Sequence, residues 1–351
     1  MTGPRLEIDL EAIAHNTRVL VDRLTPVGIR VTGVGKSSLG SPTVAAAMLR
    51  GGAHGIGDSR FENLRRLYDS GCTAPLTLIR SPLLSQVEQV VRYAGTSLNT
   101  EPVVLDALSA AAEAQHTTHD VVIMVELGDL REGVAVSDAL ALARSVSRRA
   151  GLRLAGLGTN LACQCGVVPD EQNMAVLSRL AEEVEQHCGP ITTVSGGNSA
   201  NLAWALSGAD TGRVNDLRLG EAIMLGTEPL QRTPIEGLRQ DTVTLHAEII
   251  ELQDKPAQPW GAIGQTAFGD QPPRPGTGTV RQAILGLGRQ DVDPDGLTPP
   301  AGATILGTSS DHLVLDVSDL GLAVGEELAF GLNYSALVRA MTSPFVTTLD
   351  R

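Results

Sequence analysis

The sequence IRVTGVGKSSLG, residues 29–40, joins a short apolar run to a lysine. Its second half looks like the end of a nucleotide-binding P-loop, but that motif needs a glycine at the position of Arg30. Pro42 suits the first turn of a helix that begins later than a P-loop helix would. We therefore interpret residues 29–34 as a strand that ends near Lys36, and we keep a nucleotide-binding loop only as the disfavoured alternative.

Apolar runs of this kind recur along the first two thirds of the chain, with amphipathic stretches between them. Residues 58–71 and 169–189 are typical of these helical stretches: apolar side chains recur every three to four residues in the first, and a glycine closes the second. Eight strands that alternate with helices predict a (β/α)8 TIM barrel over residues 11–235, with a doubly wound sheet as the competing α/β architecture. The expected strands are residues 29–34, 52–57, 76–80, 96–99, 121–127, 152–158, 191–197 and 222–226.

The pattern changes after about residue 235. Short β-like segments then alternate with clusters of glycine and proline, which predicts a smaller, mostly β domain over residues 236–351. Residues 5–10 also have the pattern of a strand, and we expect residues 1–10 to pack on this β domain. The β-like segments are residues 241–254, 281–288, 303–317 and 326–333.

The charge balance argues against several classes of partner. The 351 residues include 40 acidic and 27 basic side chains, a net charge of −13, so we expect neither nucleic acid nor a membrane as a partner. The N-terminus lacks the features of a signal peptide, and no apolar run is long enough to span a membrane. The four cysteines form no C-x-x-C pair and the seven histidines no metal-ligand spacing, so we expect no metal and a cytoplasmic protein with reduced thiols.

One cluster of polar residues after an expected strand is suited to an anion. Gly196 and Gly197 let the backbone approach a ligand closely. Asn198 or Ser199 can cap a helix that begins at Ala200, and the start of a helix presents free amides. An ordinary glycine-rich turn with a helix cap explains the same residues equally well, so the segment is a hypothesis for a phosphate site.

Three cations each have a functional and a structural interpretation. An apolar strand behind Lys36 would partly desolvate the amine, as a lysine that bonds to a carbonyl group requires; otherwise the side chain simply extends into solvent. Arg131 can clamp a carboxylate or pair with Asp129 or Glu132. Arg218 lies between two leucines and requires a polar partner. A lysine opposite a phosphate cradle favours pyridoxal phosphate, which needs both features in one pocket.

The order of these motifs along the chain is informative. Lys36 is followed by GDLREG (128–133), SGGNSA (195–200), RLGEAIMLG (218–226) and GTSSDHLVLDV (307–317). This order resembles the alanine racemase superfamily, the fold-type III pyridoxal phosphate enzymes, over nearly the whole chain. A closer similarity to the ornithine racemase branch rests on GTNLAC, LRLGEAI, GRQDVDP and AMTSPFV. The resemblance implies a homodimeric isomerase that interconverts the L and D forms of ornithine or another basic amino acid.

The resemblance also implies roles for individual residues. Lys36 would bear pyridoxal 5′-phosphate covalently and transfer a proton on one face of the substrate, and Arg218 would donate to the pyridine nitrogen. Arg131 would bind the substrate carboxylate, and Ser310 and Asp311 would belong to a loop that a partner subunit sends into the site. The implied cofactor contacts are Lys36, Asn160, Gly197, Asn198, Ser199, Arg218, Gly220, Glu221 and Tyr334.

The chain departs from the family at the second proton-transfer group. Alanine racemases carry G-Y-x-D-G early in the β domain, whereas residues 288–291 read GRQD. Arg289 replaces the tyrosine; arginine stays protonated and is a poor base, so we assign it to substrate binding. The candidates for the vacant role are Asp291, Tyr334, Cys163 and His312, of which the first two are assigned to catalysis with Lys36.

Two further functions stay open at this stage. A different pyridoxal phosphate reaction on the same fold, such as aldol cleavage or decarboxylation, would use the same cofactor site. A non-catalytic cofactor-binding protein would need neither the β domain nor Arg131. A basic substrate would require a carboxylate partner, and the candidates are Glu126, Asp129, Glu132, Asp291 and Asp293.

Overall fold

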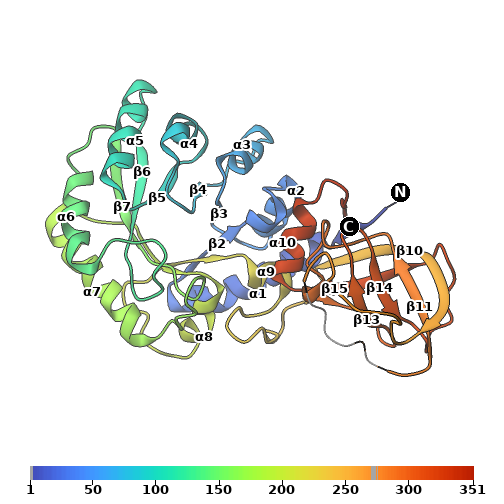
Figure 1. Cartoon of the computed structure of the whole chain (residues 1–351). Helices are drawn as coiled ribbons and strands as arrows, with labels where there is room; N and C mark the ends of the chain where they lie inside the picture. The colour runs from blue at the N-terminus through green and yellow to red at the C-terminus, as the bar shows by residue number, and fades with distance from the viewer. Residues whose placement is uncertain (1–2, 270–273, 275) are drawn as a thin grey trace. The chain divides into compact units, whose positions relative to one another are not determined.

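The computed structural model describes residues 3–269, 274 and 276–351 (Figure 1). These residues form two compact units. Residues 10–240 make up one of them. The other unit consists of the described residues up to Asp9 together with residues Asp241–Arg351.

The first unit is a closed barrel of eight parallel strands, and neighbours in the sequence are neighbours in the barrel. The first and last strands close the ring, with Arg30 opposite Asp216 and Thr32 opposite Arg218. The strands are β2 (Arg30–Val34), β3 (Gly55–Asp58), β4 (Leu76–Leu78), β5 (Thr96–Asn99), β6 (His119–Met124), β7 (Leu152–Gly158), β8 (Thr193–Gly197) and β9 (Asp216–Leu219).

Helices follow the strands, and Figure 1 shows α3 to α7 on the outside of the ring. Their ends carry the expected capping residues: Ser41 accepts from the Val44 amide, and Asp170 forms a capping box with Asn173. The α-helices of this unit are α1 (Leu10–Leu24), α2 (Pro42–Arg50), α3 (Phe61–Asp69), α4 (Val87–Tyr93), α5 (Pro102–Ala114), α6 (Val136–Val146), α7 (Glu171–Cys188), α8 (Leu202–Ala205) and α9 (Glu221–Leu225). Its 3-10 helices are η1 (Thr25–Val27), η2 (Lys36–Ser38), η3 (Leu84–Gln86) and η4 (Ser199–Asn201).

The eighth strand is not the one that the apolar pattern predicts. Residues 222–226 were expected as a strand, but they lie almost entirely in α9, and the strand is β9. The physical reason is that a short, continuous apolar run has no period, so a buried helix and a buried strand look alike in it. The true strand has the sequence DLRL, in which Asp216 and Arg218 alternate with leucines. This period of two is that of a strand, whose successive side chains point to opposite faces. The predicted barrel itself is confirmed.

The second unit is built on an eight-stranded sheet with the order β12-β15-β10-β11-β14-β13, and every neighbouring pair on this path is antiparallel. β1 pairs with β10 antiparallel and with β16 parallel. The predicted mostly β unit after the barrel is confirmed. Its elements are β1 (Arg5–Ile8), β10 (Val243–Pro256), β11 (Thr279–Leu285), η5 (Pro294–Gly296), β12 (Leu297–Thr298), β13 (Thr304–Thr308), β14 (Leu313–Asp316), β15 (Glu327–Leu332), α10 (Tyr334–Thr342) and β16 (Thr347–Asp350).

No helix within the described ranges combines the length and the apolar character that crossing a membrane requires.

Candidate active site

The carboxyl ends of the barrel strands carry a concentrated set of polar residues, which we call the rim. Because all eight strands are parallel and the sheet is closed, the segments that follow them share one end of the barrel, where barrel enzymes place their sites. The rim residues used below are Lys36 after β2, Asp58 at the end of β3, Asp129, Arg131 and Glu132 after β6, Asn160 and Cys163 after β7, Asn198 and Ser199 after β8, and Gly220 and Glu221 after β9.

Lys36 begins the 3-10 helix η2, and the chain leaves that helix through Leu39 in a left-handed conformation, with φ of 52°. Lys36 is exposed, which agrees with the alternative in which its side chain extends into solvent. The positive charge of Lys36 acts on the pKa of two carboxylates on the rim. Burial raises the pKa of Asp58 and of Glu221, and the lysine charge opposes the rise in both cases.

Asp58 is a fully buried carboxylate that the sequence analysis did not single out. Its Oδ1 accepts hydrogen bonds from the Arg60 amide and the Asn63 side chain, both at 3.0 Å. Its Oδ2 has no hydrogen-bond partner among the residues described here. No local pattern could have pointed to Asp58, because its burial comes from the packing of β3 in the ring.

The turn from β8 into η4 is held by a reciprocal pair of asparagines. Asn198 caps η4 by accepting from the Ala200 amide at 2.8 Å, and Asn201 Oδ1 accepts from the Asn198 amide at 3.1 Å. Of the two caps that were predicted, Asn198 and Ser199, Asn198 is the one that caps η4. Gly197 has φ of 140°, and a Cβ there would lie 2.3 Å from Asn201 Oδ1. The turn therefore requires glycine at this position.

Ser199 links this turn to the start of α9. Its Oγ accepts from the Ala222 amide at 3.2 Å, so the first turns of η4 and α9 lie against each other. Gly220 is the N-cap residue of α9, and Glu221 pairs with Arg232. Amides at helix starts, a hydroxyl and an asparagine amide form a donor set suited to a phosphate.

The cationic side chain of Arg218 is buried, with 6% of the residue's surface exposed. Its Nη1 donates to Ser195 Oγ and its Nη2 to the Thr159 carbonyl at 2.8 Å. Burial lowers the pKa of Arg218, and the charge of Asp216 is the largest of the influences that oppose this shift. The predicted need for a polar partner is confirmed, and the partners are Ser195 and Thr159.

Asn160 borders Arg218 and offers a hydrogen-bond donor. Its Oδ1 lies 3.5 Å from Arg218 Nη2 and accepts from Asn198 Nδ2 at 3.2 Å. Its own Nδ2 is buried and has no partner among the described residues. A buried donor without a protein partner is costly, so this atom fits contact with a bound ligand.

The loop after β6 presents Arg131, whose guanidinium makes a two-pronged contact with Glu132. The ion pair that we considered as the alternative to a substrate clamp is present in this structure. Both partners remain partly exposed, so their contact is of the weak surface kind. The Glu132 hydrogen bond is the main cause that raises the pKa of Arg131.

Asp129 holds two loops of the rim together. The residue is fully buried, and its carboxylate accepts from the amides of Gln164, Cys165 and Val167 at 2.9, 3.0 and 3.4 Å. Burial raises the pKa of Asp129, but these amides outweigh it and leave the pKa lowered. Asp129 is therefore an anchor for the neighbouring loop, in which Cys163 is exposed.

Five predicted site residues belong to the second unit. Asp291 is buried there and accepts from Ser343 Oγ at 3.0 Å and from the Gly288 amide at 3.2 Å. The guanidinium of Arg289 lies over the ring of Phe268, 5.3 Å from its centre. The other three are Tyr334, which begins α10, and Ser310 and Asp311, which form an exposed hydrogen-bonded cluster with His312.

Across the described residues, no group of three or more histidine, cysteine or acidic side chains is arranged to hold a metal ion.

Comparison with known proteins places these features in context. A family model described as "Alanine racemase, N-terminal domain" matches residues 8–229. The chain is 35% identical to the lysine racemase of Thermotoga maritima, over 99% of this chain and 98% of that protein. It is 34% identical to the ornithine racemase of Acetoanaerobium sticklandii, over 98% of both chains. The family resemblance inferred from the sequence motifs is thereby confirmed.

Solved structures agree on the fold. The alanine racemase of Streptomyces coelicolor superimposes with a TM-score of 0.79 at 18% identity, over 99% of this chain and 98% of that chain. The D-threonine aldolase of Filomicrobium marinum gives a TM-score of 0.72 at 20% identity, over 96% of this chain and 88% of that chain. Identities this low support the fold alone, and the fold is shared by an aldolase and a racemase, whose reactions differ.

Proposed function

The chain belongs to the alanine racemase family, and from this premise we propose that it is a pyridoxal 5′-phosphate-dependent racemase of a basic amino acid, ornithine or lysine. That it is an enzyme of the amino-acid racemase family follows from the full-length similarity. The choice of substrate is carried by a single observation. Two racemases named for lysine and ornithine align with 98–99% of the chain at 34–35% identity.

The residues on the rim fit the cofactor that the family implies. Asn198, Ser199 and the amides of Gly220 and Glu221 would hold the phosphate, as the donor set there suggests. Arg218 would face the ring nitrogen, and the unpartnered Nδ2 of Asn160 supplies a donor beside it. Lys36 would bear the cofactor covalently. When bound, pyridoxal phosphate acidifies the α-proton of an amino acid by spreading the charge that its removal leaves.

Lys36 would move the proton on one face of the substrate. Lys36 lies on an exposed helical turn at the end of its strand, where its amine would be placed to exchange a proton with the substrate. Arg131 would orient the substrate by binding its carboxylate, since a guanidinium matches a carboxylate in two parallel hydrogen bonds. For this contact Arg131 must exchange its present partner, Glu132, for the substrate.

For the second face we assign Tyr334 ahead of Asp291. Both oxygens of Asp291 already accept hydrogen bonds inside its own unit, which suits a structural carboxylate better than a proton carrier. Substrate contacts by Arg289, Ser310 and Asp311, and a homodimer that shares its sites, complete the proposal. Sedimentation velocity would test the dimer directly, and a monomer with full activity would contradict it.

The chain offers an unusually clean test of the cofactor, because it contains only two lysines, Lys36 and Lys255. Lys255 lies at the end of β10 in an ion pair with Glu251. Purified protein loaded with pyridoxal phosphate should show a visible absorption band, and borohydride should fix the cofactor to the peptide that contains Lys36. Lys36→Ala should abolish the band and the turnover, whereas Lys255→Ala should keep both.

Substrate choice needs a separate measurement. We expect racemisation of ornithine or lysine to proceed faster than that of alanine, measured by chiral chromatography at equal substrate concentration. Alanine at an equal or greater rate would contradict the choice of a basic substrate. Full turnover by Lys36→Ala would contradict the proposal as a whole.

A further inference from the structure

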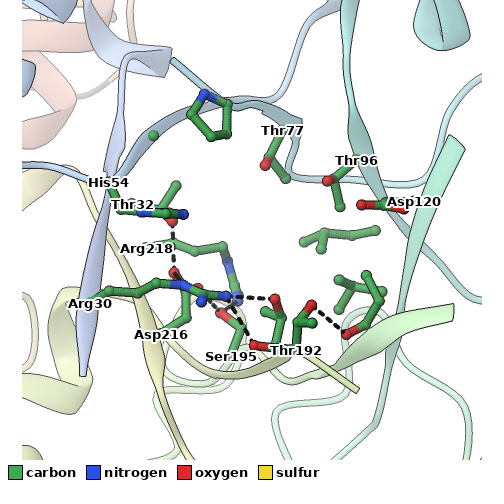
Figure 2. A pocket seen from close by; sticks show the side chains of 16 residues that line it. Arg30, Thr32, His54, Thr77, Thr96, Asp120, Thr192, Ser195, Asp216 and Arg218 are labelled. Atoms are coloured by element: carbon green, nitrogen blue, oxygen red, sulfur yellow. Dashed lines mark hydrogen bonds and ion pairs between the residues drawn. The ribbon is translucent and has the colours of Figure 1, made fainter. Parts of the chain in front are cut away.

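Three buried polar side chains, those of Arg218, Ser195 and Asp216, are joined by hydrogen bonds inside the barrel. Arg218 Nη1 donates to Ser195 Oγ, and the Ser195 hydroxyl donates to Asp216 Oδ2 at 2.5 Å. Thr32 donates to the other oxygen, Oδ1, of Asp216 at 2.7 Å. Figure 2 shows these side chains converging from neighbouring strands of the ring. Neither Ser195 nor Asp216 was among the residues that the sequence singled out for the site.

The three side chains are removed from solvent. Ser195, Asp216 and Arg218 expose 2%, 5% and 6% of their surfaces. A buried charge without a compensating partner is strongly destabilising in proteins. The two charges do not touch, but a single hydroxyl joins them. A second cation, Arg30, has its Nε 3.8 Å from Asp216 Oδ1, and its side chain is about one-third exposed.

The hydrogen-bonded side chains of Arg218, Ser195 and Asp216 form one wall of a cavity of about 320 Å³ inside the barrel, which Figure 2 shows. Its other lining residues include Arg30, Thr96, Asp120 and Thr193, which lie at or near the amino ends of their strands. The interior of such barrels is normally filled with layers of bulky branched side chains. Here polar side chains occupy much of that space, so the position of Arg218 is determined by hydrogen bonds on this side.

We propose that Ser195 and Asp216 are positioning residues for Arg218: they fix the direction of its guanidinium and offset its charge from the side opposite the rim. The inference rests on the proposed function, because it gives Arg218 the task of contacting the cofactor ring. Two of the Arg218 nitrogens are committed, one to Ser195 and one to the Thr159 carbonyl. The carboxylate of Asp216 therefore influences how much positive charge the guanidinium presents to the ring.

Asp216→Asn isolates the charge from the hydrogen bond. The asparagine oxygen can still accept from Ser195, and its amide then donates to the hydroxyl of Thr32, which accepts instead of donating, while the negative charge is gone. Asp120→Asn is the matched control, since Asp120 lines the same cavity but is bound by Arg153 through two hydrogen bonds of 2.6 Å. Both variants remove one negative charge from the cavity wall, and only one of them acts on the hydrogen-bonded chain that ends at Arg218.

The readouts are the absorption maximum of the bound cofactor, its dissociation constant, and kcat and KM at one fixed pH. We expect Asp216→Asn to shift the absorption maximum and to lower kcat about tenfold or more, with KM changed by less than about threefold, because Arg218 is assigned to the cofactor rather than the substrate. Asp120→Asn should leave the absorption maximum and kcat unchanged.

The double variant with Ser195→Ala provides the decisive comparison. If Asp216 acts through Ser195, the effect of Asp216→Asn on the absorption maximum and on kcat should largely disappear in the Ser195→Ala background. Additive effects, or equal effects of Asp216→Asn and Asp120→Asn, would overturn the inference. If Asp216→Asn does not fold, Ser195→Ala alone decides, because an unchanged absorption maximum and kcat in that variant would equally overturn it.

Failure of the proposed function looks different. In that case the unaltered chain would show no absorption band with pyridoxal phosphate and no racemisation. Failure of the positioning role requires an unaltered chain that binds the cofactor and turns over, together with variants that behave like the control.

Discussion

At the scale of single residues, Arg131, which we propose as the group that binds the substrate carboxylate, already has a partner. Its guanidinium is satisfied by Glu132, the next residue along the chain. The two side chains remain partly exposed, so their contact is weak enough for a substrate carboxylate to replace it. If Arg131 binds the substrate as proposed, Glu132 orders the guanidinium in the free protein and competes with the substrate carboxylate for it.

This arrangement predicts opposite effects for two substitutions. Arg131→Lys keeps the positive charge but loses the two-pronged geometry, so KM for the amino acid should rise about tenfold. Glu132→Gln removes the competing charge, so KM should fall by a few-fold. Steady-state kinetics of the racemisation would measure both changes.

A suitable control for these variants is Arg153→Lys, which alters a surface pair with Asp120 and should leave KM unchanged. An unchanged KM in the Arg131→Lys variant would show that Arg131 does not bind the substrate.

At the scale of the element, the turn between β8 and η4 depends on one backbone conformation. Gly197 has φ of 140°, and the space where a Cβ would lie is occupied by Asn201 Oδ1. That oxygen accepts from the Asn198 amide, so displacing it would open the reciprocal pair of asparagines. The proposed phosphate cradle is therefore only as rigid as this glycine allows.

Gly197→Ala should accordingly weaken cofactor binding. We expect the dissociation constant for pyridoxal phosphate to rise about tenfold or more and the unfolding free energy to fall by about 1–3 kcal/mol, the usual cost of a strained backbone position. Equilibrium titration of the apoenzyme by absorbance and urea unfolding would measure these two quantities.

Gly208→Ala is the matched control for this experiment. Gly208 also has a positive φ, 85°, but nothing lies within 4 Å of the added Cβ. It should lose some stability from backbone strain while its affinity for the cofactor stays unchanged. Equal losses of affinity in both variants would show that the crowding at Asn201 is irrelevant to the cradle.

At the scale of the whole molecule, a buried histidine ties the stability of the barrel to pH. His119 begins β6 with its side chain against Ser97 Oγ, at 2.8 Å. Burial lowers the pKa of His119 to about 4, against the opposing influence of the Asp120 charge. Between pH 6.5 and about 4 the unfolded chain therefore binds a proton that the folded chain does not.

Stability should consequently fall as the pH is lowered through this window. The contribution of His119 to the unfolding free energy should be fully present above pH 6.5, and about 3 kcal/mol should be lost by pH 4. Urea unfolding followed by circular dichroism at several pH values would measure the loss. His119→Gln should lose less over the same range, and the exposed His54→Gln should behave like the unaltered chain. Identical pH profiles for all three proteins would contradict the assignment.

The sequence by itself determined those features of the molecule that depend on local patterns of residues. Alternating apolar runs and helical stretches predicted the barrel and the mostly β unit, and a helix cap at Asn198 or Ser199 followed from their place before a helix. The order of short motifs identified the family, which the full-length relatives confirmed. These signals survive because helix and strand periods, caps and turns depend on residues only a few positions apart.

The tertiary structure alone decided everything that depends on closing the ring. It placed the eighth strand at Asp216–Leu219, buried Asp58, and left Lys36 exposed. It also brought Ser195 between Asp216 and Arg218, which lie about twenty residues further along the chain. The physical reason is that strand register and barrel closure determine which side chains meet inside the barrel, and neither leaves a trace in the spacing of residues along the chain.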